Sequence, residues 1–299
     1  MAKREIDLNR CLFHYTNVTC NRCESICPQK AIQNRQIDRD KCDNCGLCTA
    51  ICPTGAIHSD ADYDRCLTAA QNLEPQVLMC HKVSPEGMPC LGALNRRLLW
   101  ALASQKPLAL DISRCAECKP AVAQWLTAEI ATCNEALAAA KKAPLKLVRV
   151  KAASGKTADV PRRSFFRSLF AAAKDSATEM AEAQTERQYA FDPVVWLNKQ
   201  PDLEPSPLFP GLILQAGCNG CGLCTVLCPE KALTITEAEA DSPKRLHFSP
   251  LKCTACGLCS GNCPQNALKL QTDFSGTNTF PLTGADSAPN QQGFHLQRG

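Results

Sequence analysis

Cysteine is the residue type in this chain that most clearly carries chemistry. The 299 residues include 22 cysteines, and most of these fall into four related segments. Three segments share the run C-x2-C-x2-C-x3-C-P: CDNCGLCTAICP from Cys42, CNGCGLCTVLCP from Cys218 and CTACGLCSGNCP from Cys253. A fourth, CNRCESICP from Cys20, lacks the first cysteine, which Cys11 can supply across a longer loop. Similar tails (QKAIQ, TGAIH, EKALT and QNALK) follow the copies, so the chain holds an internal repeat arranged as two pairs.

This spacing suits an iron–sulfur cubane. Three thiolates on one tight loop hold three irons, while the cysteine before proline ligates the other cluster of the pair. The rule predicts four [4Fe-4S] clusters: cluster I on Cys11, Cys20, Cys23 and Cys52; cluster II on Cys42, Cys45, Cys48 and Cys27; cluster III on Cys218, Cys221, Cys224 and Cys263; and cluster IV on Cys253, Cys256, Cys259 and Cys228. Zinc also binds C-x2-C pairs but needs neither the third cysteine nor the closing C-P. A three-iron cluster is an alternative at the irregular cluster I.

With these motifs, residues 1–64 and 211–273 each resemble a bacterial ferredoxin domain with two [4Fe-4S] clusters. The resemblance implies compact α+β units, each with two short antiparallel hairpins and two short helices. It also implies one-electron transfer rather than catalysis. These two segments cover less than half of the chain, so the elements between them must be inferred from their own pattern.

The segment 65–152 has the pattern of a small α/β domain. Its apolar periodicity predicts elements in the order strand, helix, strand, helix, strand at residues 76–80, 90–105, 107–113, 119–143 and 145–150. This order favours a parallel sheet with right-handed crossovers. The predicted fold class is therefore α+β, with two ferredoxin-like dicluster domains flanking a small β-α-β-α-β domain.

Four further cysteines fall at one edge of this predicted sheet. Cys80 ends the first strand, Cys90 opens the following helix, and Cys115 and Cys118 follow the second strand. The carboxyl ends of parallel strands share one edge, where ligands bind, and both helix N-termini would face it. We therefore predict a fifth iron–sulfur cluster here, either [4Fe-4S] or [2Fe-2S]. Zinc on the same residues, or a redox or free thiol pair at 115 and 118, are the alternatives.

Two cysteines and one histidine remain. Cys133 lies about 22 Å beyond Cys118 along the predicted helix, too far to share its site, and reads as a packing residue. Cys66 stays a candidate ligand, because a helix that begins there would lead into the first strand. His81 reads as a solvated loop residue, although an imidazole could replace a thiolate.

Two segments outside these domains differ in composition. Residues 153–210 begin with a basic amphipathic pattern, PRRSFFRSLFAAAK, in which Phe165, Phe166 and Phe170 share one face. They continue as a proline-rich stretch that predicts an extended linker. Residues 274–299 are polar and predict a flexible tail or an arm laid on a partner.

Several classes of function have no support in the sequence. The charged start predicts no secretory signal, and no window approaches the roughly 18 apolar residues of a membrane span. A cytoplasmic location, where thiols stay reduced, suits cysteines that bind metal. No phosphate loop, dinucleotide fingerprint or nucleic-acid groove is evident, so we expect no catalytic site and no nucleic-acid partner.

The sequence thus predicts a multi-cluster electron-transfer subunit. Its expected partners are protein redox partners, such as a multi-subunit formate dehydrogenase, hydrogenase or other reductase, by analogy alone. The alternative is a ferredoxin-type accessory or maturation protein for a metalloenzyme, which the basic aromatic segment favours.

Overall fold

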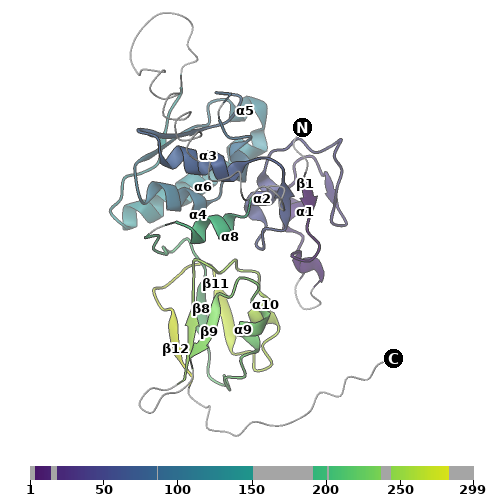
Figure 1. The fold of residues 1–299 in the computed structure, drawn as a ribbon, viewed down its shortest axis with the longest axis vertical. Helices are drawn as coiled ribbons and strands as arrows, with labels where there is room; N and C mark the ends of the chain where they lie inside the picture. The colour runs from purple at the N-terminus through teal and green to yellow at the C-terminus, as the bar shows by residue number, and fades with distance from the viewer. Residues whose placement is uncertain are drawn as a thin grey trace, which may run out of the picture. The chain divides into compact units, whose positions relative to one another are not determined.

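The computed structural model describes residues 4–14, 19–85, 87–150, 191–200, 202–236 and 244–282 (Figure 1). The chain divides into two compact units, residues 1–209 and 210–299, and each is described by itself. The segment with Phe165, Phe166 and Phe170 lies outside the described residues.

The first unit begins with a small layer of two antiparallel strand pairs and two short helices. Its elements are β1 (Arg4–Ile6), η1 (Leu12–His14), α1 (Arg22–Ile26), β2 (Ile32–Gln33), β3 (Gln36–Ile37), α2 (Leu47–Ile51) and β4 (Ile57–Ser59). Strand β1 pairs with β4, and β2 with β3. Ile32, Cys48 and Ile57 form a small buried core between them. The two short helices and the β2–β3 hairpin agree with the ferredoxin resemblance, whereas β1 and β4 pair from opposite ends of the segment and do not form the second expected hairpin.

A three-stranded parallel sheet follows in the same unit. Its strands β5 (Gln76–Met79), β6 (Leu108–Asp111) and β7 (Lys146–Leu147) lie in the order β5-β6-β7, with Gln76 opposite Leu108. Helices α3 (Tyr63–Gln71), α4 (Arg96–Ala103) and α6 (Pro120–Ala139) surround it. The prediction of a small parallel sheet is confirmed.

The first crossover helix begins later than predicted, and the second is preceded by a short helix that was not predicted. Cys90 is followed by a 3-10 turn, η2 (Leu91–Ala93), and α4 begins only at Arg96, where the Asn95 side chain accepts the N–H of Leu98 at 3.1 Å. The additional helix α5 (Cys115–Cys118) precedes α6, whose first residue, Pro120, lies within one residue of the predicted start. Proline lacks the N–H needed to continue α5 but is well placed to start a new helix.

Residues 191–209 also differ from the expected extended linker. They contain helix α8 (Pro193–Asn198), which packs beside α4 within the first unit (Figure 1). Trp196 and Leu197 are buried, and the indole N–H of Trp100 donates to the Glu204 carbonyl at 3.1 Å. The linker prediction is wrong here because the apolar face of α8 packs into the core of the first unit.

The second unit holds two antiparallel sheets and two short helices. Strand β8 (Gly211–Leu214) pairs with β11 (Leu268–Gln271), and β10 (Arg245–Phe248) lies between β9 (Leu233–Thr236) and β12 (Thr279–Pro281). The helices are α9 (Leu223–Leu227) and α10 (Leu258–Gly261). Strand β12 falls in the predicted tail, so the prediction of a flexible tail from residue 274 is wrong over the described residues up to 282, and residues 283–299 lie outside the description.

No helix in the described ranges is both long and apolar enough to cross a membrane.

Candidate metal centres

Each complete copy of the cysteine loop enters its helix through a left-handed glycine. Gly46, Gly222 and Gly257 cap α2, α9 and α10 with φ angles of 88°, 76° and 86°. A side chain is strained in this conformation, whereas glycine is not. The first copy has Asn21 at this position, with φ of −127°, so its loop enters α1 by a different turn. This is also the copy whose first cysteine is replaced by the distant Cys11.

The repeated tail after each C-P holds the returning cysteine. In every copy the backbone N–H of an alanine four residues on donates to the cysteine sulfur: Ala31 to Cys27 at 3.3 Å, Ala56 to Cys52 at 3.3 Å, Ala232 to Cys228 at 3.2 Å and Ala267 to Cys263 at 3.4 Å. The residue before each alanine is left-handed: Lys30, Gly55, Lys231 and Asn266. This turn aims the N–H at sulfur, where it stabilises the negative charge of a ligated thiolate.

The four thiols assigned to cluster I line one cavity. They are Cys11, Cys20, Cys23 and Cys52. Burial, then the neighbouring thiols, with Cys52 the foremost, raise the pKa of Cys23 to about 12. Cys11 is held by the turn after β1, where its N–H donates to the Asp7 carbonyl at 3.0 Å. The structure therefore brings the distant cysteine to the other three.

The thiols assigned to cluster II line a second cavity together with a buried arginine. The thiols are Cys27, Cys42, Cys45 and Cys48, and the arginine is Arg4. Only 3 % of Arg4 is exposed, and its guanidinium donates to Thr49 Oγ1 at 2.6 Å and to the Tyr63 hydroxyl at 3.1 Å.

Arg4 gives the cluster II cavity a fixed positive charge. Burial raises the pKa of Cys48, and the charge of Arg4 opposes that rise. The arginine therefore favours the anionic thiolates that a cluster requires. Sequence reasoning missed this residue, because nothing in the charged N-terminal stretch links it to the cysteine loops.

The second unit brings together both of its predicted sets. Cys218, Cys221, Cys224 and Cys263 line one cavity. In the set for cluster IV, burial, then Cys253, Cys256 and Cys228, and lastly Cys224 of the cluster III loop, raise the pKa of Cys259 to about 12. Each returning cysteine thus lies with the partner loop of its pair.

The four cysteines of the middle domain also converge. Cys80 follows β5, Cys90 precedes η2, and Cys115 and Cys118 are the two ends of α5. Burial, followed by Cys80, Cys90 and Cys118, raises the pKa of Cys115 to about 12. Cys118 is the exposed member of the set, and the other three are buried.

The remaining candidates lie apart from these sets. Burial and then the Asp62 charge raise the pKa of Cys66, and burial and then Glu129 raise that of Cys133 to about 12. Cysteine neighbours contribute to neither shift, and Cys133 is fully buried in α6. His81 is exposed, with its Nδ1 against the Pro89 carbonyl.

The chemistry of these sets fits clusters. All 22 cysteines are free thiols. Within the part of the chain that the structure describes, no three Cys, His, Asp or Glu side chains converge as a site for a single metal ion. Three of the predicted sets surround cavities, as a multi-atom cluster needs. Since iron binds the thiolate form, loading a cluster displaces the protons that burial retains on the thiols.

Comparison with protein families gives two matches. Residues 217–267 match a 4Fe-4S dicluster domain, and residues 18–63 match the LdpA Fe-S cluster-binding domain. The first match contains all eight cysteines predicted for clusters III and IV, and the second contains all those of clusters I and II except Cys11. A search of curated proteins finds no match. The chain is an iron–sulfur cluster-binding protein, with a 4Fe-4S dicluster domain in its second unit and another Fe-S binding domain in its first.

Proposed function

We propose that this protein relays single electrons through two pairs of [4Fe-4S] clusters, and that catalysis belongs to a partner chain. When bound, such a cluster accepts one electron and later passes one electron on, so that its charge returns to the starting value. The chain's own residues supply thiolates, N–H donors to sulfur and buried surroundings, which together set the reduction potential.

The exchange of ligands within each pair carries this proposal. Cys48 lines the cluster II cavity, while Cys52, at the other end of the same helical turn, lines the cluster I cavity. Cys23 in α1 and Cys27, which follows its last residue, are divided between the two cavities in the same way. Two short helices thus join the sites covalently on both sides. This arrangement supports rapid electron exchange within a pair.

A reversible one-electron titration tests the relay. We expect anaerobically purified protein to contain about 16 irons in its ferredoxin-type sites, with acid-labile sulfide in equal amount. Each cluster should give an EPR signal on reduction that disappears on reoxidation, with no loss of iron. A protein that holds its clusters but cannot be reduced by a low-potential donor, or that releases iron at each cycle, is not a relay.

The donor and acceptor define the second part of the proposal. A cytoplasmic redox enzyme such as a formate dehydrogenase, a hydrogenase or another reductase would supply the catalytic site, by analogy with other multi-cluster subunits. The competing function is that of an accessory or maturation protein, which the basic aromatic sequence around Phe165, Phe166 and Phe170 supports.

Polar substitutions at these three phenylalanines separate the two functions. If the protein is a relay bound through this segment, electron transfer in the purified complex should fall. If activity of the assembled complex is unchanged while assembly in cells fails, the accessory function is correct.

A further inference from the structure

We propose that Cys80, Cys90, Cys115 and Cys118 hold a fifth iron–sulfur cluster, and that this cluster exchanges electrons with cluster II across a backbone contact between their loops. The electron exchange rests on the relay proposed above, whereas the assignment of the four ligands does not. Neither family match extends over these cysteines.

The framework of the parallel sheet positions the four thiols. The Cys80 carbonyl accepts the N–H groups of Val83 and Ser84 at 2.8 and 3.1 Å, which fixes the turn after β5. At the end of β6, the fully buried Asp111 accepts the N–H groups of Ser113 and Val150 at 2.9 and 2.6 Å. These bonds fix the turn that leads into α5. The thiols therefore come from constrained turns at one sheet edge, as a preformed ligand set requires.

A lysine stands between this set and the loop of cluster II. Lys119 follows Cys118 directly, and its Nζ lies 3.2 Å from Asp43 Oδ2 and also contacts the Asp43 carbonyl. This cation thus joins the residue after Cys118 to the residue after Cys42, and places a positive charge beside both sets of thiols.

The two loops touch through backbone at two glycines. A Cβ at Gly46 would lie 2.7 Å from the Ala93 nitrogen, and a Cβ at Gly92 would lie 2.2 Å from the Cys45 carbonyl oxygen. Both distances are too short for a side chain to fit. Glycine at both positions brings the segment after Cys90 directly against the Cys45–Cys48 loop.

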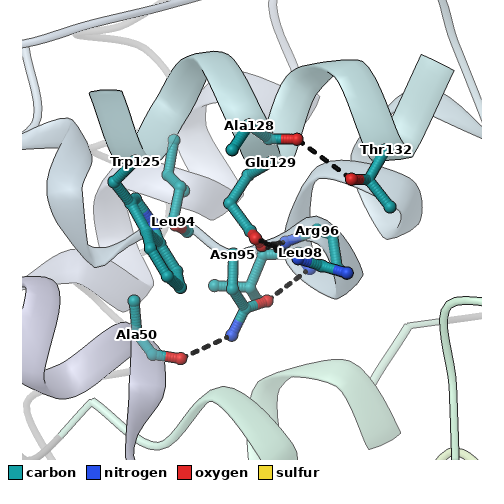
Figure 2. A network of polar contacts seen from close by, with 9 residues as sticks. All are labelled: Ala50, Leu94, Asn95, Arg96, Leu98, Trp125, Ala128, Glu129 and Thr132. Carbon is teal, nitrogen blue, oxygen red and sulfur yellow. Dashed lines mark hydrogen bonds and ion pairs between the residues drawn. The ribbon is translucent and has the colours of Figure 1, made fainter. Parts of the chain in front are cut away.

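A polar network holds this contact in place. Figure 2 shows Asn95 between α2 and α4: its Nδ2 donates to the Ala50 carbonyl, and its Oδ1 accepts the Leu98 N–H, both at 3.1 Å. Arg96 and Glu129 join α4 to α6 through a 2.6 Å ion pair. Helix α4, which follows Cys90 and η2, is therefore attached to α2, the helix that carries Cys48.

A dithiol enzyme is a poorer fit to the same residues. A redox pair needs only Cys115 and Cys118, and it would leave Cys80 and Cys90 as two buried thiols with no role beside it. Four convergent thiols with a neighbouring cation instead match the ligand count of an iron–sulfur cluster.

Metal analysis of the full chain tests the fifth site. Anaerobically reconstituted protein should bind about 20 irons if the fifth cluster is [4Fe-4S], or about 18 if it is [2Fe-2S]. The double variant Cys115→Ser, Cys118→Ser should fall to about 16. Cys66→Ser is the matched control in the same domain and should lose no iron. The single variant Cys118→Ser changes an exposed residue and should alter the fifth signal without unfolding the domain.

Three results would overturn the site. They are an unchanged iron count in the double variant, one zinc bound per chain that is lost in that variant, and a Cys115–Cys118 disulfide formed without loss of iron. A full iron count with no reversible reduction would instead contradict the relay and leave the fifth site standing.

Magnetic coupling tests the contact with cluster II. In fully reduced protein, the EPR signal of cluster II should be broadened by cluster I and further broadened by the fifth cluster, and only this additional broadening should disappear in the double variant. Lys119→Met should retain the iron and shift the potentials of both clusters, whereas Lys119→Arg should restore them. A fifth cluster whose removal leaves every other signal unchanged would contradict the coupling.

Discussion

The buried charge of Arg4 distinguishes cluster II from the other sites. Its guanidinium lines the same cavity as the four thiols and is held by Thr49 and Tyr63. A positive charge near a cluster stabilises the reduced, more negative state. Arg22 and Arg35 line the cluster I cavity but are exposed and half-buried, so water screens their charges more than that of Arg4. We therefore expect cluster II to have the higher potential of its pair, which suits a cluster from which electrons leave toward the middle domain.

Replacing Arg4 by methionine should lower the potential of cluster II. A unit charge about 8 Å away, at an effective dielectric constant of about 20, contributes about 2 kcal/mol. This is roughly 90 mV for one electron. Arg4→Lys should retain most of the potential, and Arg39→Met, which removes an exposed arginine paired with Glu5, should leave it unchanged. EPR-monitored titration measures all three variants, and an equal potential in Arg4→Met would contradict this role.

The cysteine sets and Arg4 differ in how far sequence can predict them. The spacing within each loop predicts which thiols lie near one another. The four ferredoxin-type sets therefore follow from local sequence, together with the rule that the cysteine before proline ligates the other cluster of its pair. Arg4 reaches the cluster II cavity only because β1 pairs with β4, placing Arg4 opposite Ser59. That pairing joins segments that are distant in the sequence, and no sequence motif predicts it.

At the scale of elements, the turn after each C-P explains the repeated tail. The left-handed residue is Lys30, Lys231 or Asn266 in three copies but Gly55 in the second. A Cβ at Gly55 would lie 3.1 Å from the Asp192 carboxyl carbon. Glycine is therefore required at position 55 by the packing of Asp192, the N-cap of α8, against this turn, and not by the conformation of the turn alone.

Replacing Gly55 by lysine, the residue in two other copies, should weaken this packing. The side chain would displace Asp192, which caps α8 by accepting the Val194 N–H at 2.9 Å and pairs with Arg10. We expect a loss of about 1–3 kcal/mol in unfolding free energy. Tryptophan fluorescence reports it, because all three tryptophans lie in the first unit. Lys30→Gly places glycine in the same turn and should cost less than about 1 kcal/mol; equal losses would contradict the role of Asp192.

Asn95 joins two elements, and its two functions can be separated. Asn95→Asp should keep the cap on α4 but lose the donor to Ala50, with a cost of about 1–2 kcal/mol. Asn95→Ala should lose both contacts and cost more. Hydrogen exchange should become faster in α2 and η2 in both variants, and faster at the start of α4 only in Asn95→Ala. Unchanged exchange in α2 would show that this contact does not hold the two loops together.

The order of strands and helices was predictable, whereas their ends were not. Apolar periodicity predicts the elements of the β5-β6-β7 sheet because it records burial. The turn before α4 lies with Gly92 against the Cys45 carbonyl, and the place of α8 depends on its packing against α4. Such contacts are tertiary, so the pattern of a single segment cannot reveal them.

At the scale of the whole molecule, each predicted ligand set lies entirely within one of the two units, and no set is shared between them. Clusters III and IV draw all eight cysteines from residues 210–299, and these surround a core that includes Leu212, Leu246 and Phe248. The first unit contains the other three sets. Cluster formation should therefore not require the two units to be joined.

Separate expression of the two units should divide the iron accordingly. Residues 210–299 should bind about 8 irons, and residues 1–209 should bind about 12 if the fifth cluster is [4Fe-4S], or about 10 if it is [2Fe-2S]. The Cys228→Ser variant of the short chain should disturb cluster IV rather than cluster III, although Cys228 follows the cluster III loop. EPR of each unit should reproduce its share of the full-length spectrum. If either unit loses a cluster that the intact chain retains, a ligand or a supporting contact crosses the boundary, and the division of the sites into two independent groups is wrong.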